Sequence, residues 1–162
     1  MKNLIFYLTI LLLTSSCSDS QIVIIDEKVS SNEKLNALDS SEVFSVARWH
    51  KGDAPPKYAE FKNSELVIVK TKNYESQLQE ERHSQLSQLL NEAENGNDIL
   101  MILNGVEILK EQLHLLKQLK PQDLNSVERL EKGVAESIYG DNARTENVLI
   151  NTYDLKTDWI DE

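Results

Sequence analysis

The sequence predicts an α+β protein, in which two tandem β-α-β-α-β units are joined by an amphipathic helix. Three observations predict this class. One pattern of residues occurs twice, each copy alternates short apolar runs with helical periodicity, and a leucine-bearing stretch lies between the copies. The 162 residues suffice for one ordinary domain or two small ones, so two such units fit.

The repeat is clearest between residues 45–74 and 126–155, which align without a gap and are identical at ten of thirty positions. Chance at average composition gives about two identities. Upstream, the apolar runs 22–25 and 99–103 match at a slightly shorter offset. We interpret the pattern as a tandem duplication. The identical pairs are Ser45/Ser126, Val46/Val127, Arg48/Arg129, Lys51/Lys132, Gly52/Gly133, Ala54/Ala135, Tyr58/Tyr139, Glu65/Glu146, Val67/Val148 and Thr71/Thr152.

The first half of each unit reads as a strand followed by a helix. Each opening apolar run has the length and side chains of a buried strand. In the second unit Asn104-Gly105 marks a turn, because glycine takes a positive φ without strain. The leucines that follow predict a helix with one apolar face, ended by a proline, and the first unit has a shorter version. These residues are Leu109, Leu113, Leu116, Leu119 and Pro121, with Leu35 and Leu38 in the first unit.

The second half of each unit predicts a strand with the pattern Ser-Val-x-Arg, a Lys-Gly turn, a short helix and a final strand. The short helix ends near Tyr58 or Tyr139, and the final strand covers 66–69 or 148–150. Pro55 and the proline after it stand where the first short helix would begin, which is a tolerated place for proline.

A helix is expected between the units, over residues 75–97. One stripe of it is apolar, and Asn95-Gly96-Asn97 stops it, as glycine commonly does at a helix end. We expect this stripe to pack on the two units rather than on a partner. Its members are Leu78, Leu86, Leu89, Leu90 and Ala93. The predicted organisation is therefore unit 1 over 21–74, the helix over 75–97, and unit 2 over 98–155.

The first sixteen residues have the features of an export signal. Lys2 supplies a positive start, residues 4–13 are apolar but too short to span a bilayer, and the only cysteine, Cys17, follows small residues. This resembles a bacterial lipoprotein signal: residues 1–16 would be removed, Cys17 would carry lipid, and 17–20 would form a tether. Lipid chains would anchor the protein at about 0.8 kcal/mol per buried CH₂. The alternative is an ordinary secretory signal followed by a free cysteine.

The stretch 99–152 resembles part of the plug domain of TonB-dependent outer-membrane receptors. The motifs that carry the resemblance are Leu103-Asn104-Gly105, Leu119-x-Pro121-x-Asp123-Leu124-x-Ser126-Val127-Glu128, Lys132-Gly133, Ala135, Tyr139-Gly140 and Val148-Leu149-Ile150-Asn151-Thr152. The first unit resembles the family more loosely, through Ser45-Val46, Lys51-Gly52, Ala54, Tyr58 and 67–72. In that family the plug gates uptake from inside a large β-barrel.

No long region of alternating strands for such a barrel follows the units, so we do not expect this chain to transport by itself. The resemblance implies instead a fold and a neighbourhood at the outer membrane, and Ser18 after the lipid site favours that membrane. We expect a lipid-anchored, non-catalytic accessory subunit whose partner is an outer-membrane β-barrel or another envelope-complex protein. The alternative is a periplasmic module that binds a small ligand or a cell-wall component.

The composition argues against several other functions. A net charge of −10 does not suit nucleic acid, whose phosphates attract lysine and arginine. The three histidines have no metal-ligand spacing, so we expect no metal site and no cofactor. No nucleophile motif or glycine-rich phosphate loop is present, and we therefore expect no enzyme.

The tryptophans are the remaining candidates for binding a partner, because tryptophan is enriched in interface hot spots. Trp159 lies in the acidic tail, residues 156–162, and either docks back or binds outward. Trp49 aligns with Leu130 at an apolar strand position, which favours a place in the core over a place in an interface.

Overall fold

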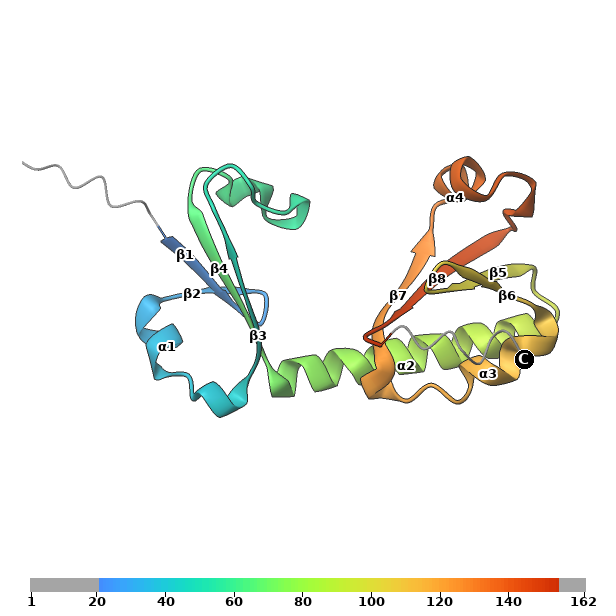
Figure 1. Cartoon of the computed structure of the whole chain (residues 1–162), viewed down its shortest axis with the longest axis horizontal. Coiled ribbons are helices and arrows are strands. Elements are labelled where there is room, and N and C mark those ends of the chain that lie inside the picture. Colours follow the sequence, from blue (N-terminus) through green and yellow to red (C-terminus); the bar gives the residue numbers. More distant parts are fainter. Residues whose placement is uncertain (1–20, 155–162) are drawn as a thin grey trace, which may run out of the picture. The chain divides into compact units, whose positions relative to one another are not determined.

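The computed structural model describes residues 21–154. The predicted signal, Cys17 and Trp159 lie outside this range. The protein is of the α+β class, as predicted, with two four-stranded mixed sheets and the helices that pack on them (Figure 1).

The first sheet has the strand order β2-β1-β4-β3. Its strands are β1 Gln21–Ile25, β2 Lys28–Ser30, β3 Val43–Trp49 and β4 Glu65–Thr71. Strand β1 is parallel to β4 and antiparallel to β2. The connections contain α1 Asn32–Ala37, the 3₁₀ helix η1 Ser40–Glu42 and the 3₁₀ helix η2 Pro56–Phe61.

The second sheet has the strand order β6-β5-β8-β7, and β5 is again parallel to the last strand of its unit. Its strands are β5 Ile99–Leu103, β6 Val106–Ile108, β7 Leu124–Leu130 and β8 Glu146–Thr152. The helical elements are η3 Lys110–Gln112, α3 Leu113–Leu116, η4 Pro121–Asp123, α4 Lys132–Tyr139 and η5 Gly140–Asn142.

The two sheets share their register as well as their strand order. Ile25 pairs with Val69 and Leu103 pairs with Ile150, so the equivalent residues are 78 and 81 positions apart, the offsets of the two sequence copies. The backbone N–H of Asp26 donates to the Val69 carbonyl at 3.0 Å, and that of Asn104 donates to the Ile150 carbonyl at 2.9 Å. A duplication explains this agreement and remains our interpretation of it.

Each unit contains a hairpin that the predicted element order did not include. Asp26 and Glu27 have φ of 49° and 65°, and Asn104 and Gly105 have φ of 49° and 87°. Two successive positive φ values let a two-residue loop return the chain, which adds the short strands β2 and β6. Asn-Gly indicates such a turn in the sequence, whereas Asp26-Glu27 does not.

The predicted helix after this hairpin is wrong in length and in part of its apolar face. Only the short η3 and α3 form, with Leu113 and Leu116 buried, while Leu109 is 53% exposed. In the first unit, η2 is a 3₁₀ helix that begins after Pro55. Gly133 lies inside α4 rather than in a turn, whereas Gly52 makes its turn with φ of 98°.

The long helix α2 runs from Lys72 to Glu94, so it begins three residues earlier than predicted and ends where Asn95-Gly96-Asn97 was expected to stop it. Thr71 caps it, because its hydroxyl oxygen accepts a hydrogen bond from the Tyr74 N–H at 3.2 Å. The last two turns of the predicted stripe are buried: Leu86, Leu89, Leu90 and Ala93. Leu78, one turn from the start, is only half-buried.

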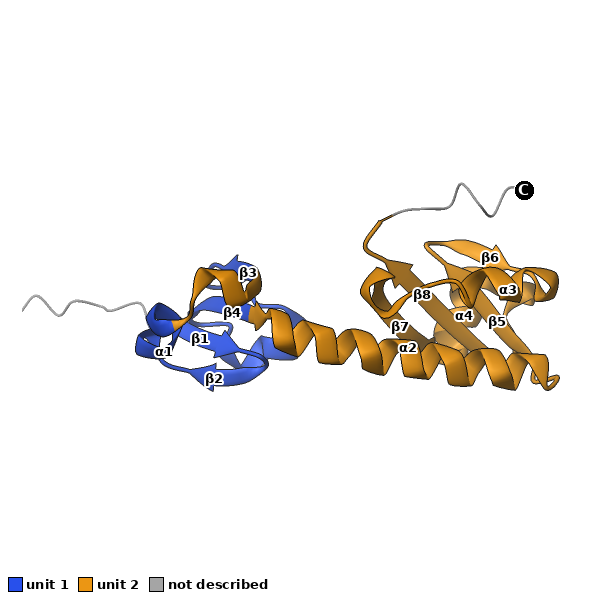
Figure 2. Cartoon of the chain, turned by 90° about the horizontal axis from the view of Figure 1, so that it is seen from below, with its two compact units in different colours: residues 1–37, 46–69 blue, residues 38–45, 70–162 orange. Residues whose placement is uncertain are grey.

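The described residues divide into two compact units, residues 21–37 with 46–69 and residues 38–45 with 70–154 (Figure 2). Helix α2 belongs to the second unit. There α2 and α3 lie on one side of the sheet and α4 on the other (Figure 1). The core beneath α2 consists of Leu86, Leu89, Leu90, Ala93, Met101, Leu103, Ile108, Leu113, Leu116, Leu124, Val127, Val148 and Ile150.

Candidate interaction surface

Strand β7 of the second unit is covered by α2. Val127 pairs across the sheet with Ile150, so both side chains lie on the same face, and both belong to the core that α2 completes. Two residues along the strand, Arg129 forms ion pairs with Glu146 of β8 and, at 3.6 Å, with Glu92 of α2. An apolar contact and a charge pair therefore hold the helix on this margin of the sheet.

The equivalent margin of the first sheet is bare. Val46 and Arg48 of β3 align in sequence with Val127 and Arg129, and β3 is the edge strand of its sheet as β7 is of the other; Val46 is 52% exposed. Arg48 is exposed and makes no ion pair among residues 21–154. The central strands of this sheet are nevertheless buried at Val23, Val67 and Val69. The exposure is thus confined to the edge strand.

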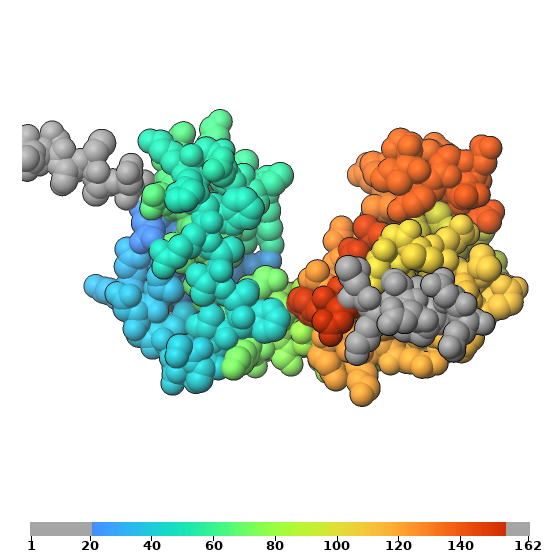
Figure 3. Space-filling model, in the orientation of Figure 1, coloured from blue at the N-terminus to red at the C-terminus, as the bar shows by residue number. Residues whose placement is uncertain are grey.

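Trp49 ends the same strand and is 38% exposed, so its predicted place in the core is wrong. Its counterpart Leu130 is half-buried. Side chains alternate along a strand, which puts Trp49 on the opposite face from Val46. We call Val46, Arg48 and Trp49 the β3 surface. The chain around β3 and η2 (teal) lies at the surface of its unit in Figure 3.

Two other exposed apolar side chains of the first sheet are not included in it. Val29 is 63% exposed but lies on β2, the opposite edge of the sheet. Phe44 is 44% exposed and belongs to the second unit, where its ring meets that of Tyr153 edge-on with centroids 6.0 Å apart. An edge strand with exposed apolar side chains is a place where soluble proteins bind partners.

A buried carboxylate in the second unit forms the densest polar cluster. Glu75 of α2 is 1% exposed and accepts hydrogen bonds from the Tyr153 hydroxyl at 2.6 Å, Arg82 at 2.6 Å and Lys70 at 3.1 Å. Arg82 also donates to the Leu124 carbonyl at 3.2 Å. We call Lys70, Glu75, Arg82 and Tyr153 the Glu75 cluster. It fastens the first turns of α2 to the segment that follows β8.

The charges of this cluster stabilise one another. Burial disfavours the ionised form of Glu75, but the hydrogen bonds from Tyr153, Arg82 and Lys70 outweigh it and lower the pKa of the carboxyl. Burial and the hydrogen bond to Glu75 both raise the pKa of the Tyr153 hydroxyl. Burial opposes the charge on Arg82, yet its hydrogen bond to Glu75 raises the pKa of the guanidinium. These groups are paired with each other, and their pairing stabilises the contact between α2 and the segment after β8.

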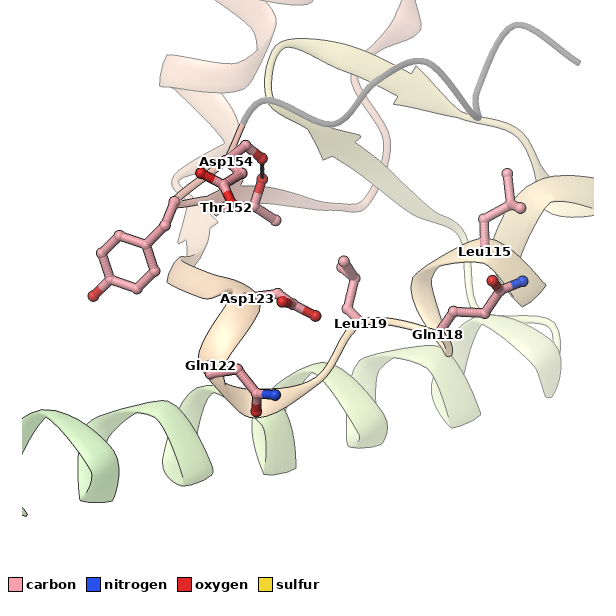
Figure 4. Close-up of a pocket in the computed structure, with 8 residues that line it drawn as sticks. Leu115, Gln118, Leu119, Gln122, Asp123, Thr152 and Asp154 are labelled. Carbon is pink, nitrogen blue, oxygen red and sulfur yellow. Dashed lines mark hydrogen bonds between the residues drawn. The ribbon is translucent and has the colours of Figure 1, made fainter.

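A cavity of about 230 Å³ lies beside the end of β8 (Figure 4). The labelled side chains come from α3, the segment after it, η4 and the end of β8. Its polar groups are partly used within the fold: Asp123 accepts from the Lys120 N–H at 2.8 Å, and the Thr152 hydroxyl donates to the Asp154 carbonyl at 2.6 Å. Ligand pockets usually measure about 300–1,000 Å³, so this cavity is smaller than most.

The described part of the chain brings no metal-binding group of side chains together. Within residues 21–154, no group of three or more His, Cys, Asp or Glu side chains could hold a metal ion. His50 lies 4.0 Å from Glu65 in the first unit, whereas His114 contacts only the Glu111 carbonyl in the second. Over the same residues, no helix combines the length and the apolar character needed to cross a bilayer.

Sequence reasoning identified one residue of this surface and missed the others. Trp49 was a candidate for partner binding, whereas Val46 and Arg48 were noted only as repeat identities. A difference between the two copies could have indicated them. Among the described residues, the leucine-bearing stretch that forms α2 lies before the second copy, and no such stretch lies before the first. The sequence did not indicate a special role for Glu75, because nothing in the sequence distinguishes it from the other acidic residues of the same helix.

Comparison with protein-family models, curated proteins and solved structures finds no significant match to this chain. The resemblance to receptor plug domains is therefore carried by the sequence motifs alone.

Proposed function

We propose that this protein is a lipid-anchored, non-catalytic interaction subunit of a bacterial envelope complex, with an outer-membrane β-barrel protein as its partner. The observation that carries the proposal is the β3 surface, where Val46 and Trp49 are exposed on an edge strand. Exposed apolar side chains on an edge strand cost solubility, and a bound partner would remove that cost.

The signal-like residues at the start of the chain support the proposed place of action. A short apolar segment that ends in small residues before Cys17 resembles a lipoprotein signal, and a lipid on Cys17 would hold the protein at a membrane. The plug-like motifs of both units support the outer membrane as that place. The partner proposed is accordingly a barrel protein rather than a soluble periplasmic one.

The alternative, a module that binds a small ligand, has weaker support. It needs a concave site with several free polar groups. The cavity at the end of β8 is small, and Asp123 and Thr152 already have partners within the fold. A larger cavity of about 390 Å³ lies beside β5 and β6, and there Arg144 already pairs with Asp98 at 3.8 Å. We place ligand binding second for this reason.

Affinity purification of the full-length protein from its own membranes in mild detergent tests the proposal. The Cys17→Ala variant is the control for anchoring, and isotope labelling of the wild type and the variant measures enrichment quantitatively. A single outer-membrane barrel protein, eluting in stoichiometric amount with the wild type, supports the proposal. Elution of the protein alone at low salt and low detergent contradicts it.

A further inference from the structure

The bare margin of the first sheet has a covered counterpart in the same chain, and the counterpart indicates what binds there. We propose that Val46 and Arg48 bind an amphipathic helix of the partner protein, with leucines against Val46 and a carboxylate against Arg48. This inference rests on the proposed function and adds the chemistry of the partner segment.

The covered edge of the second sheet shows which apolar contacts a helix makes there. On the second sheet Val127 is 7% exposed because α2 presents Leu86, Leu89, Leu90 and Ala93 to it and to the strands beside it. These positions follow the i, i+3, i+4, i+7 spacing of one helix face. Val46 is the sequence counterpart of Val127, lies on the corresponding edge strand of a sheet of the same strand order, and is 52% exposed. A helix with this spacing therefore matches the bare margin.

The arginine two residues further along each edge strand indicates a charged contact with the helix. Arg129 lies between two carboxylates, Glu146 of its own sheet and Glu92 of α2. Arg48 has a Glu at the first of these places, Glu65, whose carboxylate lies 4.0 Å from His50. No carboxylate from a helix reaches Arg48 among the described residues, so an acidic side chain on the partner helix would complete the arrangement.

The small hydrophobic core of the first unit also supports the binding of a helix there. Within residues 21–154, the second unit buries sixteen hydrophobic side chains and the first only five: Val23, Ile24, Leu66, Val67 and Val69. A small sheet with few buried side chains is marginally stable by itself. An added helix would extend its core, as α2 extends the other one.

The test uses a peptide with the sequence of residues 81–95, which carries the covering face of α2 and Glu92. A side-chain staple across Ser84 and Gln88, both exposed in α2, would reduce the cost of forming a short helix. Fluorescence anisotropy with the full-length protein in mild detergent measures the affinity. We expect binding that Val46→Asp and Arg48→Glu each weaken by about five-fold or more.

Matched control variants distinguish binding at this site from non-specific binding of the peptide. Val134→Asp and Lys110→Glu make the same kinds of change at exposed positions of the second unit, and each is expected to alter binding by less than about two-fold. A peptide with Glu92→Arg should bind the Arg48→Glu protein better than the unmodified peptide does. This charge exchange reports the contact even if Val46→Asp disturbs the strand.

Three outcomes overturn the inference: no binding up to about 1 mM, which corresponds to only about −4 kcal/mol; binding that neither variant weakens; or a charge exchange without rescue. A barrel partner that co-purifies equally with wild type and with Arg48→Glu removes the helix site but leaves the proposed function standing. Peptide binding with rescue, in the absence of any co-purifying envelope protein, supports the helix site and removes the proposed function.

Discussion

Replacing Glu75 with Gln should destabilise the second unit by about 3 kcal/mol. The carboxylate is 1% exposed and accepts from Tyr153, Arg82 and Lys70 at 2.6, 2.6 and 3.1 Å. Hydrogen bonds to charged groups contribute about 1.5–3 kcal/mol each, and breaking a fully buried pair costs about 3–5 kcal/mol. Arg82 and Lys70 keep 17% and 36% side-chain exposure, so water recovers part of the loss and places the result at the low end.

Glu92→Gln is the matched control for this prediction. Glu92 lies on the same helix, is 28% exposed and pairs with Arg129 at 3.6 Å, so its loss should cost less than about 1 kcal/mol. Urea unfolding of the full chain, followed by circular dichroism at 222 nm, gives both free energies of unfolding. Amide exchange along β8 locates the effect in the second unit. Equal losses for the two variants would show that the Glu75 cluster is not the fastening we describe.

The remaining predictions concern pH, packing, the hairpin and the anchor. The lowered pKa of Glu75 stabilises the fold fully above its unfolded value of about 4.5, and this contribution is lost as the pH falls through the folded pKa, so Glu75→Gln should flatten the acid limb of a stability-against-pH curve. Val127→Asp should cost about 3 kcal/mol or more in urea unfolding and Val46→Asp less than about 0.5 kcal/mol, because only Val127 is buried; similar losses would refute the difference in cover. Asn104→Ala should cost about 2 kcal/mol in thermal unfolding, since Asn104 exchanges two side-chain hydrogen bonds with Thr152 at 2.8 and 3.0 Å and holds a positive φ; an unchanged melting temperature would contradict this. Cys17→Ala should abolish incorporation of labelled palmitate and release the protein from membrane fractions, and a variant that still sediments with membranes would mean that lipid is not its main tether.

The α+β class could be predicted because the repeat supplied two independent readings of one element order. Apolar runs such as 99–103 and 148–150 are short and rich in aliphatic side chains, and they form the central strands as expected. The register also agrees with the sequence offsets, since parallel pairing of β5 with β8 aligns the apolar positions of both strands.

The differences arise where tertiary contacts override local patterns. Leucine spacing from Leu109 predicted one helix, but only a short helix forms: Leu113 and Leu116 are buried, Leu119 packs against the core, and Leu109 stays at the surface. Trp49 aligned with an apolar strand position, yet it is 38% exposed on the face of β3 opposite to Val46, and the first unit has only the 3₁₀ helix η2 in the sequence position of α4. In the Glu75 cluster, the hydrogen bond from Tyr153 to Glu75 joins residues 78 positions apart, which no local pattern indicates.

The central claim, that the β3 surface binds an envelope partner, is tested most directly by photo-crosslinking in living cells. A photoreactive amino acid at position 46 of the full-length protein should give one discrete adduct with an outer-membrane barrel protein or its complex. The same amino acid at Lys110, which is exposed on the second unit, serves as the control and should not give that adduct. No adduct from position 46, or the same products from both positions, would contradict the account.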